Sequence, residues 1–167
     1  MIGLPGAGKS TVARLLAIRL GVESVDLDAE VERGRGRSVS AIFEEEGEGG
    51  FRDLEARALA EALAGSRPVV LACGGGILER HENRELLASR ARVVWLAVDP
   101  TIAAERLKAS GAGTRPLLKG SELPERLRAL LECRAESYAD AADEEVSTDG
   151  STPEEIADRI AARVKAP

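Results

Sequence analysis

The chain has 167 residues, which is the size of one domain and enough to bury a hydrophobic core. Aromatic residues make up 2% of it and the formal net charge is −6, which argues against nucleic-acid binding through basic surfaces and stacking. Its two cysteines cannot build a disulfide framework, and no segment is long and apolar enough to span a membrane. We therefore expect a single soluble, cytoplasmic, monomeric domain over residues 1–167, with no membrane or nucleic-acid partner.

A phosphate-binding motif stands near the start of the chain. Residues 3–11 read GLPGAGKST, which satisfies G-x-x-x-x-G-K-[ST] and leads into an apolar helical stripe over residues 12–20. Glycines let backbone N–H groups converge on phosphate oxygens, Lys9 should reach the β- and γ-phosphates, and the Ser10 hydroxyl should ligate Mg²⁺. A glycine turn that merely caps a helix is the alternative, and it does not explain Lys9 and Ser10.

Only Met1 and Ile2 precede this loop. A loop of this kind normally follows a buried strand of several residues. The sequence therefore favours a truncated start or a misassigned initiator.

Two carboxylates follow at the end of a predicted strand over residues 24–27. Asp26 and Asp28 lie two apart, and in extended chain such residues project to the same side. One could hold the water shell of Mg²⁺ while the other engages an acceptor hydroxyl. Alternatively, Asp28 only caps the helix that follows. The residues alone do not separate these interpretations.

Helical patterns occupy the next stretch. A short helix begins at residues 41–43 and should end near Gly47, and a second is marked by leucines over residues 54–63. Arg52 stands three residues before Glu55. This pair could aim a guanidinium at a ligand or lie in solvent, where such pairs contribute little.

A second predicted strand, residues 68–73, runs into three glycines, Gly74–Gly76. Their lack of side chains favours close approach of backbone to a ligand, although a flexible turn is also possible. His81, the only histidine, should begin a surface helix. Trp95 should belong to the core, within a strand over residues 93–98.

The segment over residues 110–120 is rich in glycine, carries Arg115 and Lys119, and has no acidic residue. We interpret it as a mobile basic lid, with an ordinary solvated loop as the alternative. A leucine-marked helix over residues 123–131 follows, and Arg134 continues its apolar face. A guanidinium there needs an anion, which could be a ligand or a neighbouring carboxylate.

A weak strand near residues 145–147 precedes the last helix. Thr152 suits the N-cap, Pro153 the first helical position, and Glu155 completes a capping box. Alternating strands and helices predict a parallel sheet covered on both faces. The buried stripe of the last helix should comprise Ile156, Ile160 and Val164.

Taken in order, these segments resemble the shikimate kinase family: GLPGAGKST, DLD, SVSAIFEEEGEGGFRDLE, CGGG, RPLL, CRAESY and STPEEIA. The resemblance implies an α/β, P-loop nucleoside-monophosphate-kinase-like fold with a five-stranded parallel sheet in the order 2-3-1-4-5. It further implies a lid at about residues 109–124 and an acceptor-binding helical region at about residues 28–65. The implied reaction is the ATP- and Mg²⁺-dependent phosphorylation of the 3-hydroxyl of shikimate, on the route to chorismate and the aromatic amino acids.

Residue roles follow from the same resemblance. Catalysis would fall to Lys9, Asp28 and Arg115, and Mg²⁺ would be bound through Ser10 and Asp26. The nucleotide would be bound by Gly6, Ala7, Gly8, Lys9, Ser10, Thr11, Lys108, Arg115 and Pro153. Shikimate would be bound by Asp28, Arg52, Gly74, Gly75, Gly76 and Arg134.

Two residues depart from the family pattern, and two other functions compete. Ala7 stands where many members carry a small hydroxyl residue, and Lys108 where they often stack an arginine on adenine. The nearest rival is another small-molecule kinase, for gluconate or a nucleoside monophosphate. The other is a non-catalytic nucleotide-binding protein. A GTP switch is disfavoured because the chain has no N-K-x-D segment.

Overall fold

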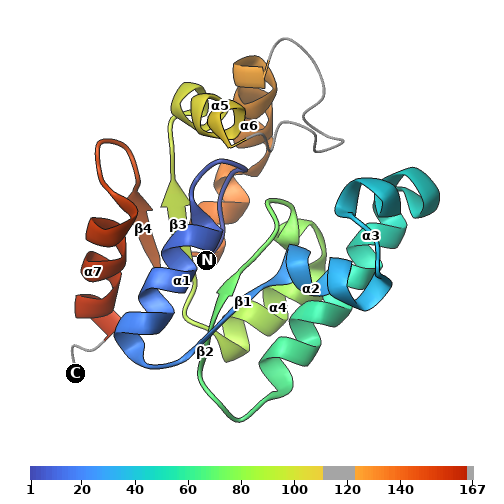
Figure 1. Cartoon of the computed structure of the whole chain (residues 1–167), viewed down its shortest axis with the longest axis horizontal. Helices are drawn as coiled ribbons and strands as arrows, with labels where there is room; N and C mark the ends of the chain where they lie inside the picture. Colours follow the sequence, from blue (N-terminus) through green and yellow to red (C-terminus); the bar gives the residue numbers. More distant parts are fainter. Residues whose placement is uncertain (111–122, 165–167) are drawn as a thin grey trace.

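The structure, a computed structural model, describes residues 1–110 and 123–164. Four short strands form its central layer: β1 Glu23–Asp26, β2 Val69–Ala72, β3 Val94–Ala97 and β4 Glu144–Ser147. β1 pairs with β2 and β3 pairs with β4, both in parallel (Figure 1). The predicted α/β class with parallel strands is confirmed.

The first two residues link the two strand pairs. The Ile2 N–H donates to the Val94 carbonyl at 2.9 Å, and the Leu96 N–H donates to the Ile2 carbonyl at 3.0 Å. On the other side, the Cys73 N–H donates to the Met1 carbonyl at 3.0 Å. Because this link is a single bridge at Ile2 and not a fifth strand, the order 2-3-1-4-5 stays a prediction.

Helices cover both faces of this layer. α1 (Lys9–Leu20) packs against α7 (Pro153–Val164), and α5 (Pro100–Ala109) packs against α6 (Leu123–Ala141). α2 (Leu27–Arg35) packs against α3 (Val39–Ala64), and α4 (His81–Arg90) lies beside the 3₁₀ turn η1 (Ile77–Glu79) (Figure 1).

Successive residues of β2 and the position after it alternate between two cores. Val70 and Ala72 belong to the core shared with α1 and α7, whereas Leu71 and Cys73 belong to the core under α4. This alternation is the period of two that a strand imposes on its side chains. The expectation that both faces of the sheet are covered is thus confirmed.

The helical backbone of α3 is interrupted at Gly47, which has φ 70° and ψ −179°. This interruption agrees with the predicted end of a helix near Gly47. Such φ/ψ values are essentially restricted to glycine. After the break, the helix carries Arg52 and Glu55 toward the glycine triplet.

The predicted capping box of α7 is confirmed. The Thr152 N–H donates to Glu155 Oε2 at 2.8 Å, and the Glu155 N–H donates to Thr152 Oγ1 at 3.2 Å. Ile156 and Ile160 are buried as predicted. Val164 is 39% exposed, so the predicted stripe is wrong there, because this residue lies in the last turn, past the packed part of the helix.

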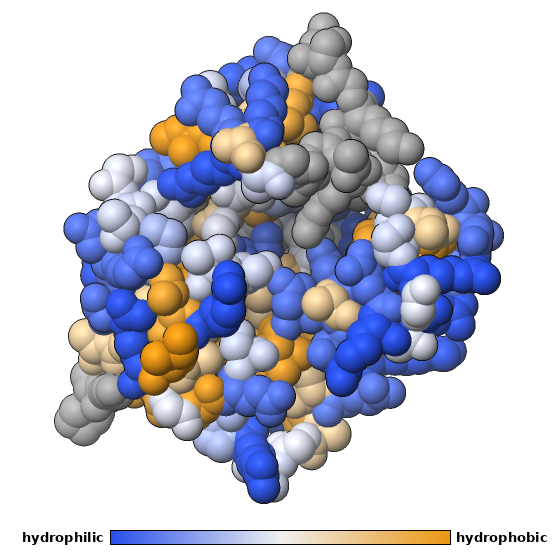
Figure 2. Space-filling view, in the orientation of Figure 1, coloured by the Kyte–Doolittle hydropathy of each residue, from blue (hydrophilic) through white to orange (hydrophobic). Residues whose placement is uncertain are grey.

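The face in Figure 2 is mainly hydrophilic, with apolar atoms in small separate groups. Among the described residues, Ile18 and Val164 are the large apolar side chains that stand exposed. None of the described helices combines the length and hydrophobicity needed to cross a membrane.

Candidate active site

The loop between Ile2 and α1 has a backbone that only glycine adopts comfortably. Gly6 and Gly8 have φ of 84° and 85°, and a Cβ at Gly6 would lie 2.5 Å from the Ala103 carbonyl oxygen. Gly8 begins α1 without a side-chain cap, so the amide end of that helix opens onto the cavity described next. The Lys9 ammonium donates to the carbonyls of Gly3 and Leu4, both at 2.9 Å.

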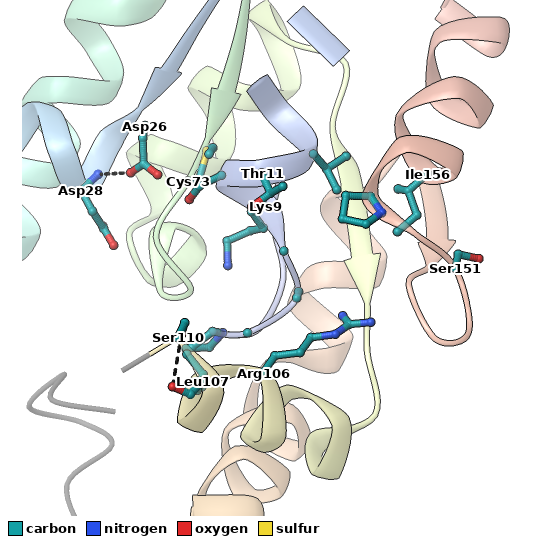
Figure 3. Close-up of a pocket in the computed structure, with 18 residues that line it drawn as sticks. Lys9, Thr11, Asp26, Asp28, Cys73, Arg106, Leu107, Ser110, Ser151 and Ile156 are labelled. Atoms are coloured by element: carbon teal, nitrogen blue, oxygen red, sulfur yellow. Dashed lines mark hydrogen bonds between the residues drawn. The ribbon is translucent and has the colours of Figure 1, made fainter. Parts of the chain in front are cut away.

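A cavity of about 490 Å³ lies over this loop. Figure 3 shows Asp26, Asp28 and Cys73 on one side of Lys9, with Leu107 and Ser110 across from them. The predicted nucleotide residues that line it are Gly6, Ala7, Gly8, Lys9, Ser10, Thr11 and Pro153.

One wall of the cavity contains an arginine that sequence reasoning missed. Arg106 donates to the Thr148 hydroxyl at 3.0 Å and to the Thr148 carbonyl at 2.9 Å, which ties α5 to the end of β4. Pro153 lines the same cavity, whereas Lys108 is exposed and does not. Arg106 and Lys108 lie on opposite sides of the buried face of α5. The side that carries Arg106 borders the cavity, and the side that carries Lys108 does not.

Asp26 and Asp28 do not lie on one extended strand, as the sequence analysis expected. The strand ends at Asp26, and Asp28 lies in the first turn of α2. Asp26 Oδ1 accepts from the backbone N–H groups of Asp28, at 3.1 Å, and Ala29, at 3.3 Å. The helix cap is therefore Asp26, and the interpretation of Asp28 as the cap is wrong. Both residues line the cavity.

Ser10 and Asp26, the residues predicted to hold a metal, both line this cavity with their side-chain oxygens. Within the described part of the chain, no group of three or more His, Cys, Asp or Glu residues forms a metal cluster. Mg²⁺ commonly uses one or two protein oxygens and keeps several waters, so this sparse set fits Mg²⁺.

Beside this cavity, two guanidinium groups meet at one carboxylate. Arg52 is buried, and its Nη1 lies 2.8 Å from Glu55, its Nε 3.0 Å from Glu79 and its Nη2 3.2 Å from Glu48. Arg134 Nη2 donates to the same Glu79. The alternative of a solvated Arg52–Glu55 pair is excluded by this burial.

Glu55 is fully buried, and its Oε1 has no hydrogen-bond partner among the residues described. Burial raises the pKa of Glu55, and the Arg52 guanidinium opposes that rise. The FR-x-x-E spacing was the signal that could have placed Glu55 among the site residues.

Tyr138 supports the same region from α6. Its hydroxyl donates to the Gly75 carbonyl. Burial raises the pKa of Tyr138 to about 12, so the phenol remains a neutral donor at physiological pH.

The three glycines are the meeting point of these groups. A Cβ at Gly74 would lie 2.2 Å from Glu55 Oε1 and 3.1 Å from Asp28 Oδ1, and one at Gly76 would lie 2.2 Å from Arg52 Nη2. Side chains of the chain itself approach this segment closely. The approach of a ligand to the glycines stays a prediction.

The middle glycine lies between Arg134 and the phosphate loop. A Cβ at Gly75 would lie 3.2 Å from Pro5 Cδ and 3.4 Å from Arg134 Nη1. The arginine pair and the phosphate loop are therefore neighbours. Arg115, Lys119 and most of the predicted lid fall outside the described residues, so the lid stays a prediction.

A glycine loop opening a helix at the strand ends, with a lysine, two carboxylates and neighbouring arginines, defines a P-loop kinase for a small acceptor. The family model for shikimate kinase matches residues 5–165. The chain belongs to the shikimate kinase family.

Individual relatives agree along nearly the whole chain. A shikimate kinase of Thermobifida fusca is 49% identical over 99% of this chain and 94% of its own length. One of Symbiobacterium thermophilum is 44% identical over 96% of this chain and 91% of its own. The solved shikimate kinase of Acinetobacter baumannii in complex with shikimate has a TM-score of 0.92 and 37% identity, covering 98% of this chain and 89% of that one.

Proposed function

We propose that this chain transfers the γ-phosphoryl group of ATP to the 3-hydroxyl of shikimate, giving shikimate 3-phosphate and ADP. Family membership gives the reaction. The observation that carries the proposal in this chain is the pair of guanidinium groups of Arg52 and Arg134 beside the phosphate loop. Bidentate guanidinium geometry matches a carboxylate, and shikimate carries one.

The nucleotide would lie in the cavity over the loop. Its phosphates would accept from the loop amides, and Lys9 would exchange its two carbonyl partners for phosphate oxygens. Arg106 and Pro153 would enclose the base, since both line that cavity. Arg106 would take the role that the family resemblance assigned to Lys108.

Ser10 and Asp26 would hold Mg²⁺, which neutralises charge on the phosphates when bound. Asp26 is positioned for this by its two backbone donors at the start of α2. Arg115 would add positive charge from the lid.

The acceptor would lie between the arginine pair and Asp28. Arg52 and Arg134 would hold its carboxylate, and Asp28, which lines the cavity, would accept from its hydroxyls. Phosphoryl transfer through a loose transition state needs little deprotonation. Asp28 therefore chiefly orients the 3-hydroxyl and receives its proton late.

The free thiols of Cys73 and Cys133 support a reducing, cytoplasmic location. A monomeric state is part of the proposal.

The decisive experiment is ADP release measured with shikimate, gluconate and a nucleoside monophosphate as acceptors. We expect turnover with shikimate. Turnover with gluconate alone would replace the proposal by the nearest rival, and ATP binding without turnover would indicate a non-catalytic nucleotide-binding protein.

Arg134→Ala tests the acid-binding pair. Loss of a charge-assisted contact should raise the shikimate KM about 10-fold to 100-fold and change the ATP KM little. Arg128→Ala, exposed on the same helix, is the matched control and should leave both KM values unchanged. Equal losses of shikimate and ATP affinity in Arg134→Ala would make Arg134 a structural residue.

A further inference from the structure

Glu79 occupies the guanidinium edges that the proposed function assigns to the substrate. It ends η1, three residues after the last glycine of the triplet. Its Oε2 accepts from Arg52 Nε at 3.0 Å, and its Oε1 accepts from Arg52 Nη2 at 3.3 Å. The same Oε1 accepts from Arg134 Nη2. One side-chain carboxylate is thus held by both arginines.

The carboxylates already paired with Arg52 leave no place for a further one. Within the described residues, Arg52 forms ion pairs with Glu48, Glu55 and Glu79, and Arg134 forms one with Glu79. Three carboxylates therefore face two guanidinium groups before any acid binds. A substrate carboxylate would be a fourth, and repulsion between like charges is strong in a partly buried site. One of the three must leave the arginines when the acid binds.

Exposure indicates which carboxylate leaves. The Glu55 side chain is 1% exposed, and its Oε1 lies against Gly74, so it has no route to water. Among the residues that the structure describes, Glu48 pairs with Arg52 and not with Arg134, so its departure would leave Arg134 occupied. The Glu79 side chain is 40% exposed, so water can replace its partners, and it is the carboxylate that both arginines share.

We propose that Glu79 is an internal competitor for the acid-binding arginines. It holds Arg52 and Arg134 when no acid is bound and rotates into solvent when the carboxylate of the acceptor takes its place. This inference rests on the proposed function. Glu79 then sets the affinity for the acceptor, and an acceptor without a negative charge fails to displace it.

Glu79→Gln keeps the shape of the side chain and removes the competing charge. We expect the shikimate KM to fall about threefold to tenfold, which corresponds to the loss of one partly exposed ion pair. The ATP KM and kcat should change by less than about twofold. Glu48→Gln is the matched control, because it removes one carboxylate from Arg52 without freeing Arg134. We expect its shikimate KM to change by less than about twofold.

Two further measurements separate competition from other roles. Calorimetric titration of shikimate without ATP should show the same gain in affinity in Glu79→Gln. The methyl ester of shikimate lacks the charge that the two arginines would bind, and it should bind weakly to both the wild type and Glu79→Gln. Glu79→Ala removes the whole side chain and should show the same fall in shikimate KM. Because the Glu79 side chain is 40% exposed, we expect this variant to fold, and its thermal midpoint checks this.

A rise in the shikimate KM of Glu79→Gln and Glu79→Ala would overturn the inference and make Glu79 a positioning residue that orients the arginines. An unchanged KM in both variants would overturn it as well, as would an unchanged affinity in the calorimetric titration. These outcomes presuppose a wild-type chain that releases ADP when shikimate is added. A wild type without that activity would instead overturn the proposed function, and the two failures are thus distinguishable.

Discussion

At the scale of single residues, Gly74 leaves room for two carboxylates. A Cβ there would lie 2.2 Å from Glu55 Oε1 and 3.1 Å from Asp28 Oδ1. We expect Gly74→Ala to lower the free energy of unfolding by about 1–3 kcal/mol, because a buried carboxylate must move. The shikimate KM should rise more than the ATP KM. Urea unfolding and initial-rate kinetics check both effects.

Gly65→Ala is the control for that substitution. Gly65 has φ −66°, and a Cβ there meets no atom within 4 Å among the described residues. Its free energy of unfolding should change by less than about 0.5 kcal/mol. A Gly74→Ala variant as stable as Gly65→Ala would contradict the packing described for the glycine triplet.

Glu55 should make stability depend on pH. Burial raises its pKa above the ordinary value of 4.5, although the Arg52 guanidinium opposes the rise. A carboxyl group with a raised folded-state pKa contributes stability that is fully present below 4.5 and is lost as the pH rises through the folded pKa. Glu55→Gln cannot ionise and should lack this loss.

As the pH rises above 4.5, the wild type should therefore lose stability relative to Glu55→Gln. Urea unfolding over a series of pH values measures it. Glu105→Gln, at an exposed position on α5, should keep the pH slope of the wild type. Parallel curves for Glu55→Gln and wild type would show that Glu55 has no shifted pKa.

At the scale of secondary-structure elements, the break in α3 orients the helix face that carries Arg52. Glu48 directly follows Gly47. Arg52 lies four residues after Glu48, and Glu55 lies three residues after Arg52, so the three side chains share one helix face. This face of α3 contacts η1. A continuous helix through Gly47 would rotate that face relative to Ser38, which caps the first half.

Gly47→Ala should lower the free energy of unfolding by about 1–3 kcal/mol, because φ 70° with ψ −179° is strained for any residue with a Cβ. It should also raise the shikimate KM. Gly49→Ala, two residues later in helical backbone with open space around it, should be neutral or stabilise by up to about 1 kcal/mol. Equal effects of the two substitutions would contradict the role of the break.

Elements with a local signature could be predicted from the sequence. The phosphate loop, the break at Gly47, the start of α4 at His81 and the capping box of α7 each depend on residues close together in the chain. A helix after Asp28 was predicted, but its start was not. Asp26 ends β1 and caps α2, so Leu27, an apparent strand residue, is the first residue of the helix.

At the scale of the whole molecule, the parts of the site that depend on distant segments could not be predicted. Glu79 and Arg134 lie 55 positions apart, and nothing near Glu79 in sequence indicates an arginine partner. Arg106 was missed because its partner, Thr148, is brought to it by β4. Family resemblance supplied the Arg52 and Arg134 pair, and the fold supplied the carboxylate between them.

The packing of Trp95 gives the molecule an optical reporter of its own. Trp95 is the single tryptophan, and its ring lies 5.7 Å from that of Tyr138. Tyr138 in turn donates to the Gly75 carbonyl, whose backbone lies beside Arg134. Trp95 is thus connected through Tyr138 and Gly75 to Arg134. We expect binding of an acid at the arginines to change the fluorescence intensity of Trp95, so that binding can be followed without an attached dye.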